Sequence, residues 1–327
     1  MIISRTPLRM SFVGGGSDLP SFYRRHGGAV VSTAINKFVY ITLNEKFDHR
    51  IRVSYSRTEE ADSVAQIQHP LVRESMSLLG VAGGIELTSI ADIPSKGSGL
   101  GSSSAFTVGL LNALHAYAGR YASAEQLAQE ACAIEIERCG EPIGKQDQYA
   151  AAFGGFNFIE FNADDSVRVE PILCKRETLA QLQENILMFY TGISRSASAI
   201  LKNQQEVVAS SEAKQQMLQR MVALARELKG ELQKNKVERF GEILHQGWEL
   251  KREMTGEISS AEIDGWYAAA RKAGAVGGKL LGAGTGGFMM FYAPKEKHEG
   301  IATALKELRR IPVKFEPQGS RIIFVHD

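Results

Sequence analysis

The sequence predicts an α+β protein with two domains. Its 327 residues exceed the usual size of a single hydrophobic core. Strand-like and helical segments alternate in the first half, whereas residues 194–254 are rich in Gln, Glu, Lys, Ala and Leu, which favour helices. A strand, helix and strand pattern closes the chain and indicates a second α+β domain. We expect the boundary within residues 162–185 and divide the chain into residues 1–175 and 176–327.

The N-terminal elements begin as a sheet. Apolar residues up to Val13 predict a strand, "GGGSD" a glycine turn, and "DLPSFYRRHGG" a short helix. The β-branched runs "GAVVSTAI" and "FVYITLNE" predict a hairpin around Asn36 and Lys37, and "RIRVSYS" predicts a third strand. "GIELTSIADIP" predicts another strand, which leads into a loop of glycines and serines.

Helices follow this loop. "SAFTVGLLNALHAYAG" predicts a buried helix ending near Gly119, and "SAEQLAQEACAIEIERCG" predicts an amphipathic helix capped by Ser123. "GGFNFIEF" predicts a strand. Later, "AVGGKLLGAGTGGFMMFYAP" predicts strands on both sides of a glycine loop, and "KEKHEGIATALKELRR" predicts a helix. "IPVKFEP" and "RIIFVHD" are expected to be the last strands of the second domain.

Composition and charge argue against several classes of protein. Lys and Arg number 38 against 37 Asp and Glu, whereas a nucleic-acid-binding protein is expected to carry a basic excess. Cys132, Cys139 and Cys174 are an odd number without metal-ligand spacing, which favours reduced thiols. Arg5 and Arg9 interrupt any signal peptide, and no apolar run approaches the roughly 18 residues of a transmembrane helix. We expect a soluble cytoplasmic protein with no nucleic-acid or membrane partner; a homodimer is allowed but not required.

Three glycine clusters occupy residues 14–16, 97–104 and 282–287. Glycine clusters most often serve turns, so each alone is explained equally well by local structure. The middle cluster, "GSGLGSSS", lacks the lysine of a Walker A loop and has Ser102 where a dinucleotide fingerprint requires glycine. Its backbone N–H groups precede a predicted helix, whose macrodipole favours an anion. We therefore expect a phosphate-binding loop of another kind.

Three ordered motifs give the chain a resemblance to the GHMP kinases, the family of galactokinase, homoserine kinase, mevalonate kinase and phosphomevalonate kinase. They are "PLRMSFVGGGSDLP" at residues 7–20, "PSKGSGLGSSSA" at residues 94–105 and "KLLGAGTGGF" at residues 279–288. The resemblance implies an N-terminal domain like domain 2 of ribosomal protein S5 and a ferredoxin-like C-terminal domain. ATP and a sugar would bind between these domains.

Within the family, three segments narrow the resemblance. "GGGSDLP", "GKQDQYAAAFGGF" and "YTGISRSAS" are most similar to sugar-1-kinases that act on D-glycero-D-manno-heptose 7-phosphate. Fucokinase-like or other sugar-1-kinases are the alternative, as is a catalytically silent sugar-binding module of the same fold. The silent module is disfavoured because the serine loop, Glu137 and Asp147 occur together. The heptose product would supply nucleotide-activated heptose for capsule, S-layer or lipopolysaccharide.

The resemblance implies that the middle loop wraps the ATP phosphates. Hydroxyls of Ser102 or Ser103 would help to hold Mg²⁺, because hard cations prefer oxygen ligands. Glu137 would supply the carboxylate, with Glu135 and Glu141 as alternatives. Helix capping by the serines and a solvated helix face for the glutamate are the structural explanations. The implied ATP-binding residues are Lys96, Gly97, Ser98, Gly99, Leu100, Gly101, Ser102, Ser103 and Ser104.

The resemblance assigns catalysis to Asp147 and Arg9. Asp147 would be the base that accepts the proton of the sugar hydroxyl, and Arg9 would lie beside it. A first-turn helix acid and an ordinary salt bridge are the structural explanations of these two residues. Lys145 departs from the family, where many members have an apolar residue, so its ammonium could face substrate, Asp147 or solvent.

Sugar binding is assigned mainly to Asp18 and Arg195. Asp18 matches an acid that accepts hydrogen bonds from sugar hydroxyls, with a helix cap as the structural explanation. Arg195 is the leading candidate for the distal phosphate, since guanidinium makes bidentate contacts, although a surface ion pair also explains it. Lys175, Arg176 and Lys202 are weaker candidates. The implied substrate-binding residues are Gly15, Gly16, Ser17, Asp18, Asp147, Arg195, Gly284 and Gly286.

Overall fold

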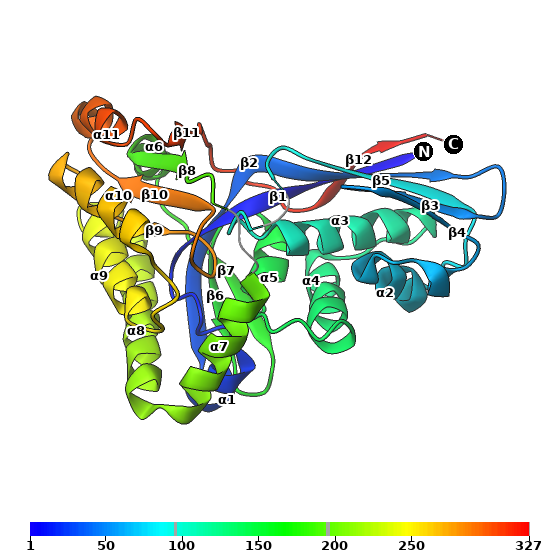
Figure 1. The fold of residues 1–327 in the computed structure, drawn as a ribbon, viewed down its shortest axis with the longest axis horizontal. Coiled ribbons are helices and arrows are strands. Elements are labelled where there is room, and N and C mark those ends of the chain that lie inside the picture. The colour runs from blue at the N-terminus through cyan, green and yellow to red at the C-terminus, as the bar shows by residue number, and fades with distance from the viewer. Residues whose placement is uncertain (95–96, 194–196, 327) are drawn as a thin grey trace.

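The computed structural model describes residues 1–94, 97–193 and 197–326, and its strands form two sheets (Figure 1). The larger sheet contains β1 (Ile2–Val13), β2 (Gly28–Glu45), β3 (Ile51–Ser54), β4 (Thr58–Ala61), β5 (Ile85–Ala91), β6 (Phe156–Phe161), β7 (Val167–Pro171) and β12 (Arg321–Val325). The smaller sheet contains β8 (Ile186–Tyr190), β9 (Gly277–Leu280), β10 (Phe288–Tyr292) and β11 (Arg309–Arg310). The α+β class predicted from the sequence is confirmed.

The predicted hairpin around Asn36 and Lys37 is wrong, because both residues lie inside the single long strand β2. The first part of β2 pairs with β6 and the second part pairs with β5. Between these parts the register against β1 shifts. Asn36 donates its backbone N–H to the Lys314 carbonyl at 2.9 Å, and its side-chain oxygen accepts from the Lys314 N–H at 2.7 Å. The polar pair thus marks an irregularity that a third segment stabilises, rather than a turn.

The helices within residues 70–153 lie on one side of the larger sheet, and those within residues 212–272 pack against both sheets (Figure 1). The buried helix predicted after the serine loop is α3, which packs on β1 and β2, and Ser123 caps α4 by accepting from the Gln126 N–H. A π-helical turn, Ala133–Arg138, extends α4. The helices are α1 (Pro20–His26), α2 (Pro70–Leu79), α3 (Ser102–Tyr117), α4 (Ala124–Cys132), α5 (Gln146–Phe153), α6 (Arg176–Glu184), α7 (Ala197–Ser210), α8 (Glu212–Gln233), α9 (Phe240–Arg252), α10 (Ala261–Lys272) and α11 (His298–Ala304).

The smaller sheet has the ferredoxin-like arrangement that the family resemblance implies. Its strand order is β11-β8-β10-β9, and each neighbouring pair is antiparallel. Helices α7 to α10 connect β8 to β9, and α11 connects β10 to β11. This is a β-α-β-β-α-β connectivity in which the first and third strands are central. Helix α9 packs on β9 and also contacts β1 of the larger sheet.

The end of the chain returns to the larger sheet. Strand β12 pairs antiparallel with β1, and Phe315 forms an isolated bridge with Ile35. The two termini therefore lie side by side (Figure 1). The prediction that "RIIFVHD" is a strand is confirmed, but its placement in the second domain is wrong. Strand β1 leaves one edge open after pairing with β2, and the C-terminal strand fills that edge.

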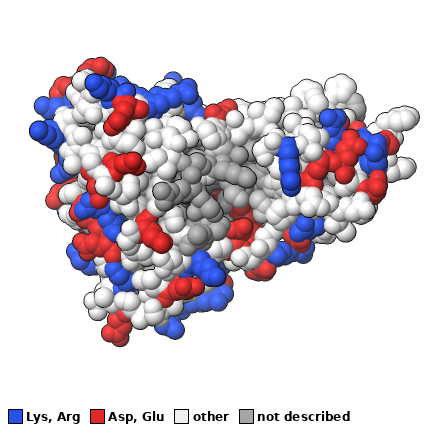
Figure 2. Space-filling view, viewed as in Figure 1, with Lys and Arg blue, Asp and Glu red and all other residues white. Residues whose placement is uncertain are grey.

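The surface seen in Figure 2 carries charges of both signs, and the cysteines are unpaired. On the face seen in Figure 2, acidic and basic side chains are interspersed at both ends of the molecule, without a continuous basic stripe among the residues described there. Cys132, Cys139 and Cys174 are all free thiols. Among the residues that the structure describes, no helix has the length and apolar character needed to span a membrane.

Candidate active site

The loop at residues 97–101 leads directly into α3. Gly97, Gly99 and Gly101 have φ values of 67°, 73° and 75°, a left-handed conformation that glycine adopts without strain. Ser98 holds the loop against the helix: its hydroxyl lies 2.8 Å from the Ser102 hydroxyl and accepts from the Leu100 N–H at 3.3 Å. The loop thus brings backbone N–H groups to the positive end of a 16-residue helix, as a phosphate requires.

Glu135 is the carboxylate that meets the serines. It accepts from the Ser103 hydroxyl at 2.8 Å, the Ser104 hydroxyl at 2.7 Å and the Gln148 amide at 2.6 Å. The prediction that Glu137 lies beside the serines is wrong, because its side chain is exposed on the opposite side of the π-helical turn. Glu135, one of the two alternatives, is fully buried.

The surroundings of Glu135 suit a hard cation. Burial raises the pKa of this carboxyl to about 6, and its three hydrogen bonds oppose part of that rise. The amide oxygen of Gln148 is also buried, without a hydrogen-bond partner in the described structure. Carboxylate, hydroxyl and amide oxygens are the ligands that Mg²⁺ accepts. Since the described residues contain no cluster of three or more acidic, histidine or cysteine ligands, a metal here would depend on phosphate and water for its remaining ligands.

Arg9 and Asp147 form a second centre, beside Gly99 and Gly101 of the loop. Nε and Nη2 of Arg9 both lie 2.7 Å from Oδ1 of Asp147, and Nη1 donates to the Gly99 carbonyl at 2.7 Å. Arg9 is buried, whereas the Asp147 side chain is 26% exposed. A methyl group on Gly101 would lie 3.4 Å from the Asp147 carboxyl carbon. The guanidinium therefore holds a partly open carboxylate directly beside the phosphate loop.

Asp18 lies within electrostatic range of Asp147, on the glycine turn after β1. Its Oδ1 accepts from the Gly16 N–H at 2.9 Å and from the Gln146 amide at 3.1 Å, and its Oδ2 accepts from the Gln146 N–H at 3.3 Å. Burial and the neighbouring Asp147 carboxylate raise its pKa. Gly15 lies close by, since a methyl group there would be 3.7 Å from the Gln146 amide nitrogen.

Two further residues of the sequence analysis, Ser17 and Lys145, make contacts elsewhere. The Ser17 hydroxyl donates to the Ala29 carbonyl and accepts from the Ala29 N–H, and the residue is fully buried. The prediction that Ser17 binds substrate is therefore corrected to a structural role in anchoring the turn to β2. Lys145 donates to the Asp165 carbonyl at 3.0 Å and its ammonium lies 3.5 Å from the Asp165 carboxylate, so it faces away from Asp147.

The second glycine loop, residues 282–287, packs against the first. A methyl group on Gly99 would lie 2.3 Å from the Leu281 carbonyl oxygen, and one on Gly282 would lie 2.3 Å from the Gly99 Cα. One on Gly287 would lie 2.4 Å from the Ser98 carbonyl oxygen. Contacts this close exclude any side chain, so glycine is required on both sides.

Gly284 and Gly286, which the resemblance assigns to substrate binding, pack on other segments of the chain. Gly284 packs on Ile258, where a methyl group would lie 2.9 Å from Cα, and Gly286 packs on the Ile193 carbonyl. Gly282 and Gly287 make the contact with the phosphate loop instead. Between them, Thr285 has a φ of 60°, which is uncommon for a β-branched residue, and its buried hydroxyl has no hydrogen-bond partner in the described structure.

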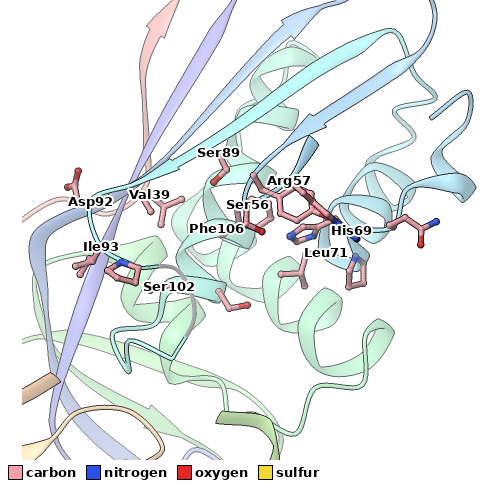
Figure 3. Close-up of a pocket in the computed structure, with 16 residues that line it drawn as sticks. Val39, Ser56, Arg57, His69, Leu71, Ser89, Asp92, Ile93, Ser102 and Phe106 are labelled. Carbon is pink, nitrogen blue, oxygen red and sulfur yellow. The ribbon is translucent and has the colours of Figure 1, made fainter. Parts of the chain in front are cut away.

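A cavity of about 950 Å³ extends from the start of α3 along β5 toward α2. In Figure 3, Ser102 lies near the helix start, Arg57 and His69 lie on one side, and Asp92 lies on the opposite side. Apolar and aromatic surface from Tyr55, Leu71, Ile93 and Phe106 lines the space between them. A cavity of this size, joined to a phosphate loop, can accommodate a nucleoside.

Two buried lysines were missed by the sequence interpretation. Lys251 on α9 donates to the Gly282 carbonyl, and Lys279 on β9 donates to the Phe12 carbonyl at 3.1 Å. Both are at least nine-tenths buried. Lys279 stands in the "KLLGAGTGGF" motif, but nothing in the local sequence shows that the Lys251 side chain enters the cleft. Of the other predicted site residues, Lys96 and Arg195 lie outside the described residues.

Comparison with known proteins identifies two domains of one family in this chain. Residues 64–155 match the GHMP kinases N terminal domain, and residues 228–310 match the GHMP kinases C terminal domain. The chain is 30% identical to the D-glycero-alpha-D-manno-heptose 7-phosphate kinase of Campylobacter jejuni, over 94% of this chain and 93% of that protein. It is 25% identical to the bifunctional fucokinase/GDP-fucose pyrophosphorylase of Arabidopsis thaliana, over 94% of this chain and 31% of that protein.

A solved structure is also similar over the whole chain. The crystal structure of a D-glycero-D-manno-heptose 1-phosphate kinase from Bacteroides thetaiotaomicron matches with a TM-score of 0.81, 26% identity and complete coverage of both chains. The chain belongs to the GHMP kinase family and is a phosphotransferase that acts on sugars.

Proposed function

We propose that this kinase transfers the γ-phosphoryl group of ATP to the anomeric C1 hydroxyl of D-glycero-D-manno-heptose 7-phosphate, giving the 1,7-bisphosphate. The observation that carries the reaction type is the Arg9–Asp147 pair beside the phosphate loop. The substrate is supported by the relative of 30% identity, which is a heptose 7-phosphate kinase. The similar solved structure is described as a 1-phosphate kinase, so the position of transfer is itself part of the proposal.

In the proposed reaction, Asp147 is the general base. Its exposed carboxylate oxygen accepts the proton of the C1 hydroxyl as that oxygen forms a bond to the γ-phosphorus. The bond between the γ-phosphorus and the bridging oxygen breaks, and ADP leaves with the electron pair. Arg9 orients the base and holds it against the Gly99 carbonyl, while Asp18 orients sugar hydroxyls.

The nucleotide would lie between the loop at residues 97–101 and the cavity of Figure 3. The loop binds the phosphates, and the cavity beside Tyr55 and Phe106 receives the base. Mg²⁺, when bound, neutralises phosphate charge, and Glu135 with Ser103 would hold it. Ser102 is the less favoured of the two serines because its hydroxyl pairs with Ser98 rather than with Glu135.

A coupled ADP-release assay with a panel of sugars tests the substrate. The panel contains heptose 7-phosphate, unphosphorylated heptose, L-fucose and D-galactose, and phosphorus NMR identifies the phosphorylated carbon. We expect kcat/KM for heptose 7-phosphate to exceed that for every other sugar by at least about tenfold. Equal values for the two heptoses, or preference for fucose, would instead support the fucokinase-like alternative suggested by the Arabidopsis relative.

Arg195 remains our proposed contact for the distal phosphate, on the basis of the sequence. Arg195→Ala should raise KM for heptose 7-phosphate by roughly 10- to 100-fold, the scale of a lost charged hydrogen bond, and leave KM for ATP unchanged. Lys175→Ala is the matched control, since it removes a cation that the resemblance does not favour. An unchanged KM in Arg195→Ala together with a raised KM in Lys175→Ala would move the phosphate contact to Lys175.

A further inference from the structure

Lys251 is a buried ammonium without an acidic partner. Its residue is 7% exposed, and its ammonium donates to the Gly282 carbonyl of the second glycine loop. In the described parts of the chain, no carboxylate lies within ion-pair distance of it. A buried charge is costly unless it is paired, so a cation kept here indicates that something anionic binds beside it.

The neighbouring charges leave Lys251 uncompensated. Arg9 is paired with Asp147, and both oxygens of Asp18 already accept hydrogen bonds. Burial, with a smaller contribution from the charge of Arg9, lowers the pKa of Lys251 to about 8, although Asp18 and Asp147 oppose part of this shift. Lys251 therefore lies within electrostatic reach of both members of the Arg9–Asp147 centre.

Lys279, the other buried lysine, holds a different part of the chain from Lys251. Its ammonium donates to the Phe12 carbonyl, and burial followed by the charges of Lys251 and Arg9 lowers its pKa far below the ordinary lysine value. Lys279 therefore joins β9 to β1, whereas Lys251 holds the glycine loop that contacts Gly99. Of these two buried lysines, Lys251 is the one placed beside the phosphate loop.

Contacts between the two glycine loops place Lys251 near the reacting end of the site. Lys251 holds the Gly282 carbonyl, and Gly282 packs directly on Gly99. The Gly99 carbonyl accepts from Arg9, which binds Asp147. These contacts connect helix α9, which belongs to the C-terminal half of the chain, to the proposed base through the two loops. A phosphate at the far end of the sugar would lie away from this centre.

We propose that Lys251 is a further catalytic residue, whose ammonium binds an oxygen of the phosphoryl group during its transfer from ATP to the sugar. This inference rests on the proposed phosphoryl transfer at Asp147. Lys251 would supply positive charge where negative charge is redistributed over the phosphoryl oxygens, while the Gly282 carbonyl keeps the ammonium in place. The strained Thr285, with its unpartnered hydroxyl, provides a second donor in the same loop.

Steady-state kinetics of Lys251→Met tests the proposal. We expect kcat to fall by about 100-fold or more, with KM for ATP and for the sugar changed less than about threefold. Lys214→Met is the matched control, because Lys214 also donates to a backbone carbonyl, that of Glu253 after α9, but outside the cleft. Unchanged kcat in Lys251→Met would overturn the proposal. A raised KM for heptose 7-phosphate with normal kcat would overturn it too, since the anion would then be the distal phosphate.

A binding measurement does not depend on the sugar. Calorimetry of ATP binding at pH 8, in two buffers of different ionisation enthalpy, counts the protons taken up. Near its pKa of about 8, Lys251 is partly deprotonated, and a bound phosphoryl group favours the ammonium, so we expect uptake of up to about half a proton. The acidic groups facing it, Asp18 and Asp147, and the cations Arg9 and Lys279 are the other charges of the cleft.

The same measurement on Lys251→Met assigns the proton. Loss of the uptake supports Lys251, whereas retained uptake assigns the proton to Lys279 and overturns the proposal. Absence of uptake in the unmutated protein overturns it as well, even if the variant fails to fold. If no sugar in the panel is phosphorylated while ATP binding shows proton uptake that depends on Lys251, the proposed substrate fails and the lysine's contact with the nucleotide stands.

Discussion

Two carboxylates flank the phosphate loop, and their surroundings are opposite. Asp147 is 26% exposed and bound by two nitrogens of Arg9. Glu135 is fully buried and accepts only neutral donors, two serine hydroxyls and one amide. Among the described residues, no cation lies within ion-pair distance of Glu135. Asp147 therefore has a cationic partner and is partly exposed to solvent, whereas Glu135 has no cationic partner among the described residues and is buried.

This difference separates the two roles. A partly exposed carboxylate whose orientation is fixed by guanidinium is suited to accept a proton from a substrate hydroxyl. A buried carboxylate without a cation, whose pKa burial raises to about 6, is stabilised when a positive charge arrives. Asp147 is thus arranged for proton transfer and Glu135 for metal binding, although both lie next to the same loop.

The largest expected effect concerns Asp147. Asp147→Asn keeps the shape of the side chain but removes the proton acceptor, so kcat should fall by about 100-fold or more. Nucleotide affinity, measured by calorimetry, should change little, because the phosphate loop is intact. Asp264→Asn is the control: Asp264 also pairs with an arginine, Arg252 at 3.0 Å, but on the surface between α9 and α10.

Near-normal turnover in Asp147→Asn would contradict the assignment of proton transfer to Asp147. It would mean that positioning and charge neutralisation suffice, and that the Arg9 pair is only structural. A loss of turnover in Asp264→Asn of similar size would show that an effect on folding, rather than on proton transfer, had been measured.

The second effect is a pH dependence of stability. Because the folded-state pKa of Glu135, about 6, lies above its ordinary value of 4.5, the protonated form stabilises the fold below pH 4.5. This contribution is lost as pH rises through about 6. The shift corresponds to about 2 kcal/mol in the free energy of unfolding, at roughly 1.4 kcal/mol per pKa unit.

Urea unfolding of the unmutated protein and Glu135→Gln, without metal, measures this contribution. Between pH 4 and pH 8, the unmutated protein should lose about 2 kcal/mol relative to the variant, which has no titrating group at this position. Parallel pH profiles for the two proteins would show that Glu135 is ionised as easily in the fold as in water, and the contrast with Asp147 would disappear.

Much of the fold was predictable because the signals were local. The Ser123 cap, the apolar run of α3 and the strands around "GAGTGG" all depend on neighbouring residues. The irregularity at Asn36 and the return of β12 to β1 depend on partners far along the chain, Lys314 and β1. Such contacts leave no periodic pattern in the sequence around them.

Most contacts of the candidate site also join distant segments and were not predictable from the local sequence, but Glu135 is an exception. Glu135 was recognisable from periodicity, since it follows the buried Ala131 and Cys132 by four and three residues, whereas Glu137 faces solvent. The contact of Gly282 with Gly99 was not predictable, because it joins two loops that lie far apart in the sequence. Lys251 was hidden for a similar reason: a lysine in an amphipathic helix is usually a solvated residue, and only the position of the second glycine loop shows otherwise.

The smallest expected effect separates the two glutamates of the π-helical turn. Glu135→Gln removes one charged oxygen ligand, so the Mg²⁺ concentration for half-maximal activity should rise by up to about tenfold. Glu137→Gln removes the same charge two residues away on the exposed surface and should leave the titration unchanged. Activity measured against free Mg²⁺ at fixed ATP compares them directly, and dilution of both variants into the same ionic strength removes general screening from the comparison. If Glu137→Gln shifts the titration and Glu135→Gln does not, the metal is bound on the exposed side of the turn. The buried carboxylate would then serve only to join α3 to α5 through Ser103, Ser104 and Gln148.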